Sequence, residues 1–248
     1  MSERIRGVRN GLTLIAGLLL LWQLMYLWTG DVALASPLQT LRYTFKLFTE
    51  ESFGVQVAET LRAFAIAYAL SVAIGLAVGF WLGFDRLSGD ALEPMIVSVY
   101  AIPKLTLYPI LLLAFGLTLS AKVAFGVIHG VIPIILFTLS AVHNTKPILI
   151  KTGRVMKLTR WQMVRWILFP AAIPEIFTGL RVGFALTLIG SLLAEMFASQ
   201  RGLGYMLMNA IGLHNVELIM SVTFVIVVFA AAVSVILLHI DHRLHRRG

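Results

Sequence analysis

The chain has 248 residues, of which 59% are hydrophobic and 13% are charged, with a formal net charge of +8 and no cysteine. Soluble domains are about half apolar and about a quarter charged, so this composition indicates a membrane protein and argues against a soluble enzyme. Basic loops facing the cytoplasm explain the positive charge more simply than nucleic-acid binding. The absence of cysteine excludes disulfides and thiolate chemistry, and the six histidines lack metal-site spacing, so we expect no metal ligands and no nucleic-acid partner.

Long runs without charged residues predict the membrane spans. Five runs of 17 to 23 residues cover 10–30, 63–84, 105–121, 123–145 and 218–240. A helix needs about 20 residues to cross a hydrocarbon core about 30 Å thick. A sixth segment, Ile167–Ala198, is long enough but contains three charges. We therefore expect an all-α, polytopic membrane protein with six transmembrane helices in a single transmembrane domain, residues 1–248.

The first 54 residues predict one span and one surface helix. Three arginines precede the apolar run Gly11–Thr29, which is long for a signal peptide and favours an uncleaved first helix. The alternative of a signal peptide stays open, since Ala33-Leu34-Ala35 resembles a cleavage site. Ser36-Pro37-Leu38-Gln39 is typical of a capped helix start. The pattern over 37–52 predicts an amphipathic outer helix, with either a packing or a binding role.

The second span carries small residues at intervals of four, which place them on one helix face. Such faces let helix backbones approach closely in a membrane, and we interpret this one as a packing surface whose neighbour lies in the same chain or in a partner. Its members are Ala67, Ser71, Gly75, Gly79 and Gly83.

Two prolines, Pro103 and Pro109, interrupt the next helix. Proline removes a backbone donor, and broken backbone in a membrane is tolerated only where protein or water surrounds it. Lys104 lies between them and has two interpretations: it attracts an anion along a substrate pathway, or its side chain extends to the cytoplasmic interface. The snorkelling habit of lysine favours the second.

The segment 146–165 is a strongly basic loop with six Lys/Arg residues. Pro147 is placed to start a short helix over Ile148–Lys157, and Thr159-Arg160-Trp161-Gln162 matches a capping box that starts another. With this loop and both termini in the cytoplasm, 13 basic residues lie inside and four outside, as the positive-inside rule requires.

Charges inside the following span are candidates for a function, because a charge in the membrane is costly. Arg181 and Glu195 are 14 residues apart, about 21 Å along a helix, so they do not pair within it. Arg181 either meets an anionic substrate or pairs with Glu175 or a partner. Glu195 either gates the outer end of a pathway, contacts a binding protein, or bonds to the glycine-rich turn over 200–205.

The basic loop resembles that of the permease subunits of type I, binding-protein-dependent ATP-binding-cassette importers. Their hallmark is E-A-A-x3-G-x9-I-x-L-P, and this chain has Lys151-Thr152-Gly153, Lys157, Ile167, Phe169 and Pro170 at those positions. The spacing and the end of the motif match. Lys157 replaces the motif's glycine, which leaves open whether a tight turn forms there.

Further short motifs resemble the nitrate, sulfonate and taurine branch of this family, over roughly residues 55–210. They are Thr60-Leu61-Arg62, the Gly75/Gly79/Gly83 series, Leu92-Glu93-Pro94, Ile102-Pro103, Pro109, Phe115-Gly116, Pro170-Ala171-Ala172 with Pro174, Thr178-Gly179-Leu180-Arg181, Glu195 and Gly202-Leu203-Gly204.

The resemblance implies a MetI-like permease fold with a core at about 55–240 and both termini cytoplasmic. It also implies a multi-pass protein of the bacterial inner membrane that acts as a homodimer, with two cytoplasmic ATP-binding subunits, an extracytoplasmic solute-binding protein and surrounding lipid. The chain has no P-loop motif, so ATP and Mg²⁺ are expected in the partner ATPase and no cofactor in this chain. The transported solute is expected to be a small anion of the sulfonate, nitrate or taurine kind.

The loop is expected to couple ATP hydrolysis in the partner to transport. The expected coupling residues are Ile148, Leu149, Lys151, Thr152, Gly153, Arg154, Val155, Met156, Lys157, Ile167 and Pro170. Lys104, Arg181 and Glu195 are the candidates for a substrate pathway or gate. One alternative function is a membrane-embedded enzyme such as a lipid-modifying transferase, but the sequence shows no pair of carboxylates, catalytic triad or metal cluster that converges in the spans. Another alternative is an energy-coupled uptake component that works without a binding protein.

Overall fold

The computed structural model describes residues 2–245, without the side chains of residues 2–8, 160, 198 and 245. This part of the chain is helical and contains no strand, which confirms the all-α prediction. The α-helices are α1 (Ser2–Thr29), α2 (Pro37–Phe48), α3 (Glu51–Phe84), α4 (Arg86–Ala101), α5 (Tyr108–Phe115), α6 (Leu119–His143), α7 (Pro147–Val155), α8 (Arg160–Met163), α9 (Phe169–Ala198), α10 (Leu203–Gly212) and α11 (Val216–His245), with a 3₁₀ turn η1 (Lys104–Leu107) and a π-helical turn η2 (Val164–Leu168).

Five helical segments of the described chain are long and apolar enough to cross a membrane, and they contain α1, α3, α6, α9 and α11. α4 and the η1–α5 segment meet at an angle of 84°. If the two count as one bent span, the described chain has six spans. The prediction of a span over 105–121 is wrong. α5 ends at Phe115, Gly116 adopts a positive φ of 65°, and α6 begins at Leu119. The predicted sixth segment, which contains three charges, forms the continuous helix α9.

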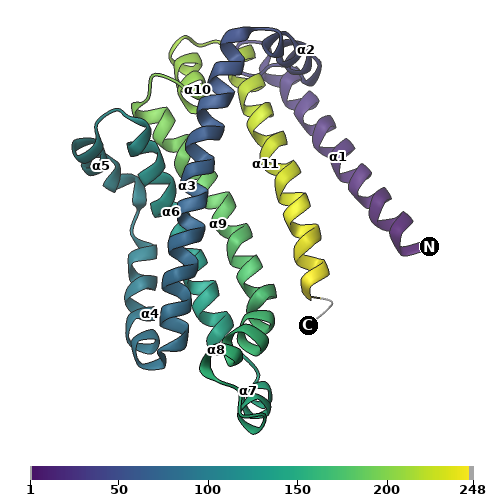
Figure 1. The fold of residues 1–248 in the computed structure, drawn as a ribbon. Helices are drawn as coiled ribbons and strands as arrows, with labels where there is room; N and C mark the ends of the chain where they lie inside the picture. The colour runs from purple at the N-terminus through teal and green to yellow at the C-terminus, as the bar shows by residue number, and fades with distance from the viewer. Residues whose placement is uncertain (1, 246–248) are drawn as a thin grey trace.

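The centre of the bundle is built from α3, α6 and α9 (Figure 1). The small residues of α3 face α6, so the neighbour lies in the same chain. A Cβ atom on Gly79 would lie 2.5 Å from Thr138 Cβ, and one on Gly75 would lie 2.6 Å from Ile134 Cγ2. Ala67 and Ser71 are fully buried on the same side. The predicted packing surface is therefore present, and its bare face sets the distance between the two helices.

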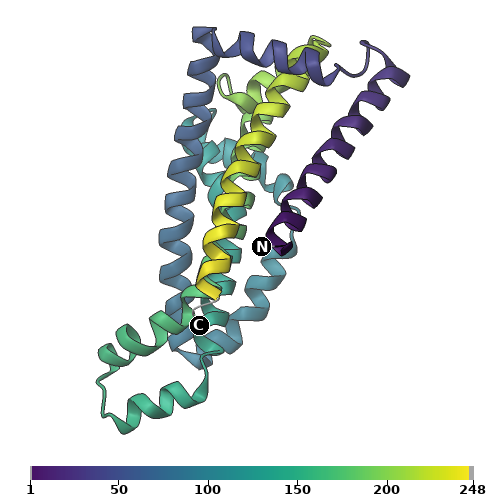
Figure 2. The same cartoon turned by 90° about the vertical axis from the view of Figure 1, so that its right-hand side faces the viewer.

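The bundle has two distinct ends. α2 and α10 lie at one end, and α7 and α8 protrude at the other (Figures 1 and 2). The capping box predicted at the start of α2 is present, since Gln39 N–H donates to Ser36 Oγ (3.2 Å) and Ser36 N–H donates to Gln39 Oε1 (2.7 Å). α1 leans away from the other spans, and no part of its apolar window is buried within the chain.

Candidate functional site

The loop between α6 and α9 begins with α7, whose bounds are close to the predicted helix over 148–157. Its end is a compact turn: Leu158 N–H donates to Gly153 O and Met156 N–H donates to Thr152 O, both at 3.0 Å. Lys157 adopts a φ of 53° in this turn, a conformation that helix ends normally give to glycine. The tight turn therefore forms with lysine in the place of glycine.

Gly153 of α7 packs closely against the segment that leads into α9. This residue is buried, and a Cβ atom there would lie 2.6 Å from Met163 Cε and 2.7 Å from Ile167 Cδ1. The second predicted capping box is also present, because Thr159 N–H donates to Gln162 Oε1 (2.8 Å) and Gln162 N–H donates to Thr159 Oγ1 (3.3 Å). Close packing and a capped turn thus hold α7 against the segment that leads into α9.

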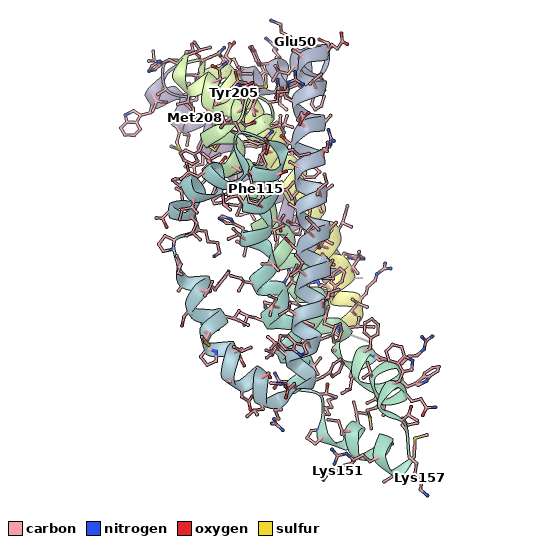
Figure 3. All side chains as sticks on the ribbon, turned by 60° about the vertical axis from the view of Figure 1, so that its left-hand side comes forward. Glu50, Phe115, Lys151, Lys157, Tyr205 and Met208 are labelled. Atoms are coloured by element: carbon pink, nitrogen blue, oxygen red, sulfur yellow. The ribbon has the colours of Figure 1, made fainter. Side chains whose placement is uncertain are left out.

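The predicted coupling residues divide into an outward and an inward set. Side chains on the outward side are exposed, with 64% of Ile148, 82% of Val155 and 65% of Met156 accessible. Figure 3 shows Lys151 and Lys157 at the tip of this protrusion. An apolar surface rimmed by basic side chains at the far end of a molecule is typical of a protein-docking surface. The exposed members on α7 and its terminal turn are Ile148, Leu149, Lys151, Thr152, Arg154, Val155, Met156 and Lys157.

The inward set lines a pocket of about 520 Å³ between the end of α6, α7 and the start of α9. Leu149, Ile167 and Pro170 belong to its wall. Glu175 also lines it and accepts a hydrogen bond from Ser140 Oγ at 2.7 Å. Leu149 and Pro170 remain exposed at this pocket, whereas Gly153 is buried against Met163 and Ile167 and holds the loop on the bundle. The motif spacing alone did not give this distinction.

Glu195 lies near the opposite end of the bundle and is fully buried. Its Oε2 accepts hydrogen bonds from Thr60 Oγ1 (2.7 Å) and Gly204 N–H (3.0 Å), and Lys122 Nζ lies 3.9 Å from its Oε1. The bond to the glycine-rich turn is thus present. Because the carboxyl group has no exposed surface, it does not contact another protein in this conformation.

The turn before α10 is shaped around this carboxylate. Gly202 has a φ of 118°, and a Cβ atom there would overlap the Glu195 carboxylate. Lys122 Nζ donates to Arg201 O at 2.9 Å, and Gln56 accepts from Gly202 N–H at 2.6 Å. Sequence reasoning missed Gln56 and Lys122 as members of this site. Thr60 belongs to the family motif Thr60-Leu61-Arg62, and this resemblance was the sequence signal that could have indicated the site.

Arg181 pairs with a residue that the sequence did not suggest. Its Nη2 lies 3.5 Å from Asp241 Oδ2 on α11, and Thr178 Oγ1 donates to the other oxygen of Asp241 at 3.2 Å. The predicted alternative partner, Glu175, instead accepts from Ser140. Arg181 remains about one-third exposed and lines a groove between α9 and α11.

Lys104 remains a candidate for either of its two interpretations. It follows the break between α4 and η1, and its Nζ donates to Tyr100 O at 3.0 Å. α4 and the segment Lys104–Phe115 meet here at an angle of 84° and together are long and apolar enough for one bent span, so Lys104 lies at the bend within that span.

Within residues 2–245, no three His, Asp or Glu side chains are grouped closely enough to hold a metal ion.

Comparisons with known proteins point to transport. Residues 71–247 match the protein family described as binding-protein-dependent transport system inner membrane component. The nitrate import permease protein NrtB of Synechocystis sp. is 30% identical over 205 residues, which are 79% of this chain and 74% of NrtB. The putative aliphatic sulfonates transport permease protein SsuC of Bacillus subtilis is 27% identical, covering 82% of this chain and 75% of SsuC.

A riboflavin transport system permease protein, RibX of Chloroflexus aurantiacus, is 33% identical over 52% of this chain and 48% of RibX. Among solved structures, a chain of the inward-facing MetNI methionine ABC transporter superposes with a TM-score of 0.66 at 20% identity, over 76% of this chain and 94% of that one. At this identity, the structural likeness shows the fold alone, and it confirms the MetI-like prediction.

Proposed function

Because the chain belongs to the family of binding-protein-dependent transport system inner membrane components and is a permease subunit of an ATP-binding-cassette importer, we propose that it moves a small anionic solute inward by alternating access. Its relatives in the nitrate and sulfonate branch, as expected from the sequence, support the class of solute. These relatives are transport permeases, so they give no support to the alternative of a membrane enzyme.

The observation that carries the mechanism is the α7 protrusion. Its outward face carries exposed apolar residues, while Gly153 fixes its inward face on Met163 and Ile167. A partner ATPase that binds the outward face transmits its movement to α9, because Gly153 of α7 packs directly on Met163 and Ile167 in the lead-in to that helix. ATP can drive the change only if the partner binds the two states of the permease with different affinities.

The proposed assembly contains two copies of this chain, two ATP-binding subunits on the α7 side and a solute-binding protein on the α2 and α10 side. ATP and Mg²⁺ are bound by the ATP-binding subunits, and this chain supplies neither cofactor nor catalytic residue. The positive-inside rule supports a cytoplasmic α7 loop and cytoplasmic termini, in a bacterial inner membrane.

Co-purification tests the docking surface. V155D places a charge on the exposed face of α7, where 82% of the side chain is accessible. F45D makes the same kind of change at the other end of the molecule, where 72% of Phe45 is accessible. We expect V155D to lower the amount of co-eluting ATPase at least about tenfold, because apolar anchors typically contribute about 2 kcal/mol or more to an interface. We expect F45D to retain the ATPase. Equal retention by both variants would refute the docking assignment.

A further inference from the structure

A shallow groove runs along α9 between α4 and α11. It encloses about 470 Å³ and is lined by Tyr100 of α4, by Arg181, Ala185 and Leu186 of α9, and by Ser234 of α11, among others. Much of its wall is apolar, and Arg181 is the basic residue among its lining residues in the described chain. The groove therefore combines an apolar wall with a cation, as sites for small organic or inorganic ions commonly do.

Tyr100 joins this groove to the break in the α4–α5 span. Its ring lies 4.3 Å from Lys104 Nζ, and its carbonyl oxygen accepts from the same nitrogen at 3.0 Å. Lys104 does not itself line the groove, but it contacts a tyrosine that does. It lies at the bend of 84° between α4 and the η1–α5 segment, about 80 residues before Arg181 in the sequence.

Lys104 has no carboxylate within 4 Å in the described part of the chain. Its recorded partners are a carbonyl oxygen and an aromatic ring, both of which are neutral. A cation at membrane depth is costly and usually faces a counter-charge or water. Neither apolar protein nor lipid would compensate the positive charge of Lys104. Its position therefore favours contact with water and mobile anions.

Arg181 differs, because Asp241 partly compensates it. The distance of 3.5 Å from Nη2 to Oδ2 is longer than that of a close charge-assisted hydrogen bond, and the side chain keeps about one-third of its surface accessible. An anion in the groove can therefore approach Arg181 without first displacing Asp241. Arg181 thus supplies positive potential inside the groove, and Lys104 supplies it at Tyr100, which forms part of the groove wall.

We propose that the groove between α4, α9 and α11 is an anion path, in which Lys104 and Arg181 hold a small oxyanion or sulfonate in turn and Tyr100 separates the two positions. This inference rests on the proposed function and adds to it the residues that meet the solute. It assigns Glu195 no part in the path, because that carboxylate is buried and bonded to the turn before α10.

Thiol labelling tests this path without knowledge of the natural solute. The chain contains no cysteine, so S234C introduces a single, nearly isosteric thiol into the groove wall. I236C lies two residues away on α11, is 59% exposed and does not line the groove. The full chain in liposomes is treated with a negatively and a positively charged methanethiosulfonate reagent, neither of which crosses the bilayer, and each rate is divided by that of free cysteine.

We expect the S234C thiol to react at least about tenfold faster than the I236C thiol, and to favour the anionic reagent. As a general scale, one unit charge at about 8 Å from a reacting thiol, at a dielectric constant of about 40, changes the rate about fivefold. R181Q and K104Q are therefore each expected to lower the anionic preference about fivefold or more, whereas K104R keeps it, which controls for folding.

Two results would overturn the proposal. If S234C reacts no faster than I236C, lipid or a second copy of the chain covers the groove. If it reacts quickly but R181Q and K104Q leave the preference unchanged, the groove holds water and no anion site. Neither result affects ATPase co-purification, so failure of the path and failure of the proposed function are distinguishable.

Discussion

Substitution of Lys157 by glycine is expected to stabilise the end of α7. Lys157 has a φ of 53°, and left-handed backbone costs a residue with a side chain about 1–2 kcal/mol. The greater freedom of glycine in the open state offsets about 0.5–1 kcal/mol of that gain. The net gain in the free energy of local opening is thus about 0.5–1 kcal/mol, which corresponds to roughly a two- to fivefold higher protection factor in hydrogen exchange.

The informative amide is that of Leu158, which donates to Gly153 O across the turn. Hydrogen exchange followed by mass spectrometry on the purified protein measures the protection of this amide. K157A is the matched control, because it removes the same charge but keeps a side chain on the left-handed backbone. The reasoning is refuted if K157A raises protection as much as K157G does, since relief of charge repulsion would then explain both. It is also refuted if K157G leaves protection unchanged.

Two further substitutions test the packing and the buried charge, with thermal unfolding in detergent as the measurement. G79A is expected to cost about 1–3 kcal/mol, because the new Cβ atom would lie 2.9 Å from a backbone oxygen of α6 and the helices must separate. G54A, in the same helix but with nothing within 4 Å, is expected to be neutral or stabilising; equal losses would contradict the packing argument. E195A is expected to cost about 3–5 kcal/mol, since it leaves a buried lysine without its counter-charge, whereas the exposed E217A should stay within about 0.5 kcal/mol. A small effect of E195A would show that the carboxylate contributes little to holding the turn before α10.

Local signals in the sequence predicted local structure well. The capping boxes at Ser36 and Thr159 involve atoms three residues apart, so the sequence contains both partners of each bond. The small residues of α3 likewise share one helix face by periodicity alone. The identity of the opposing helix was beyond such signals, since α6 lies more than 50 residues further along the chain.

Hydropathy misplaced one span because it measures composition and not direction. The run over 105–121 has no charge, but a bend precedes it, and Gly116 turns the chain before α6 begins. The prolines indicated a break, yet the angle of that break decides which side Lys104 faces. The same limit applies to Glu195, whose hydrogen-bond partner Thr60 is 135 residues away, and to Arg181, whose partner Asp241 comes from the last helix.

The departures of the α7 loop from the family motif fall into two physical kinds. Gly153 stands where the motif has alanine, and it faces inward, where it lets α7 approach Met163 closely. Lys151 replaces an acidic residue and Lys157 replaces glycine, and both side chains face outward at the tip. The inward change at Gly153 is accommodated by packing within the chain. The outward changes at Lys151 and Lys157 are not explained by contacts within the described chain. In the proposed assembly, this basic face favours an acidic surface on the ATPase subunit that is expected to dock here.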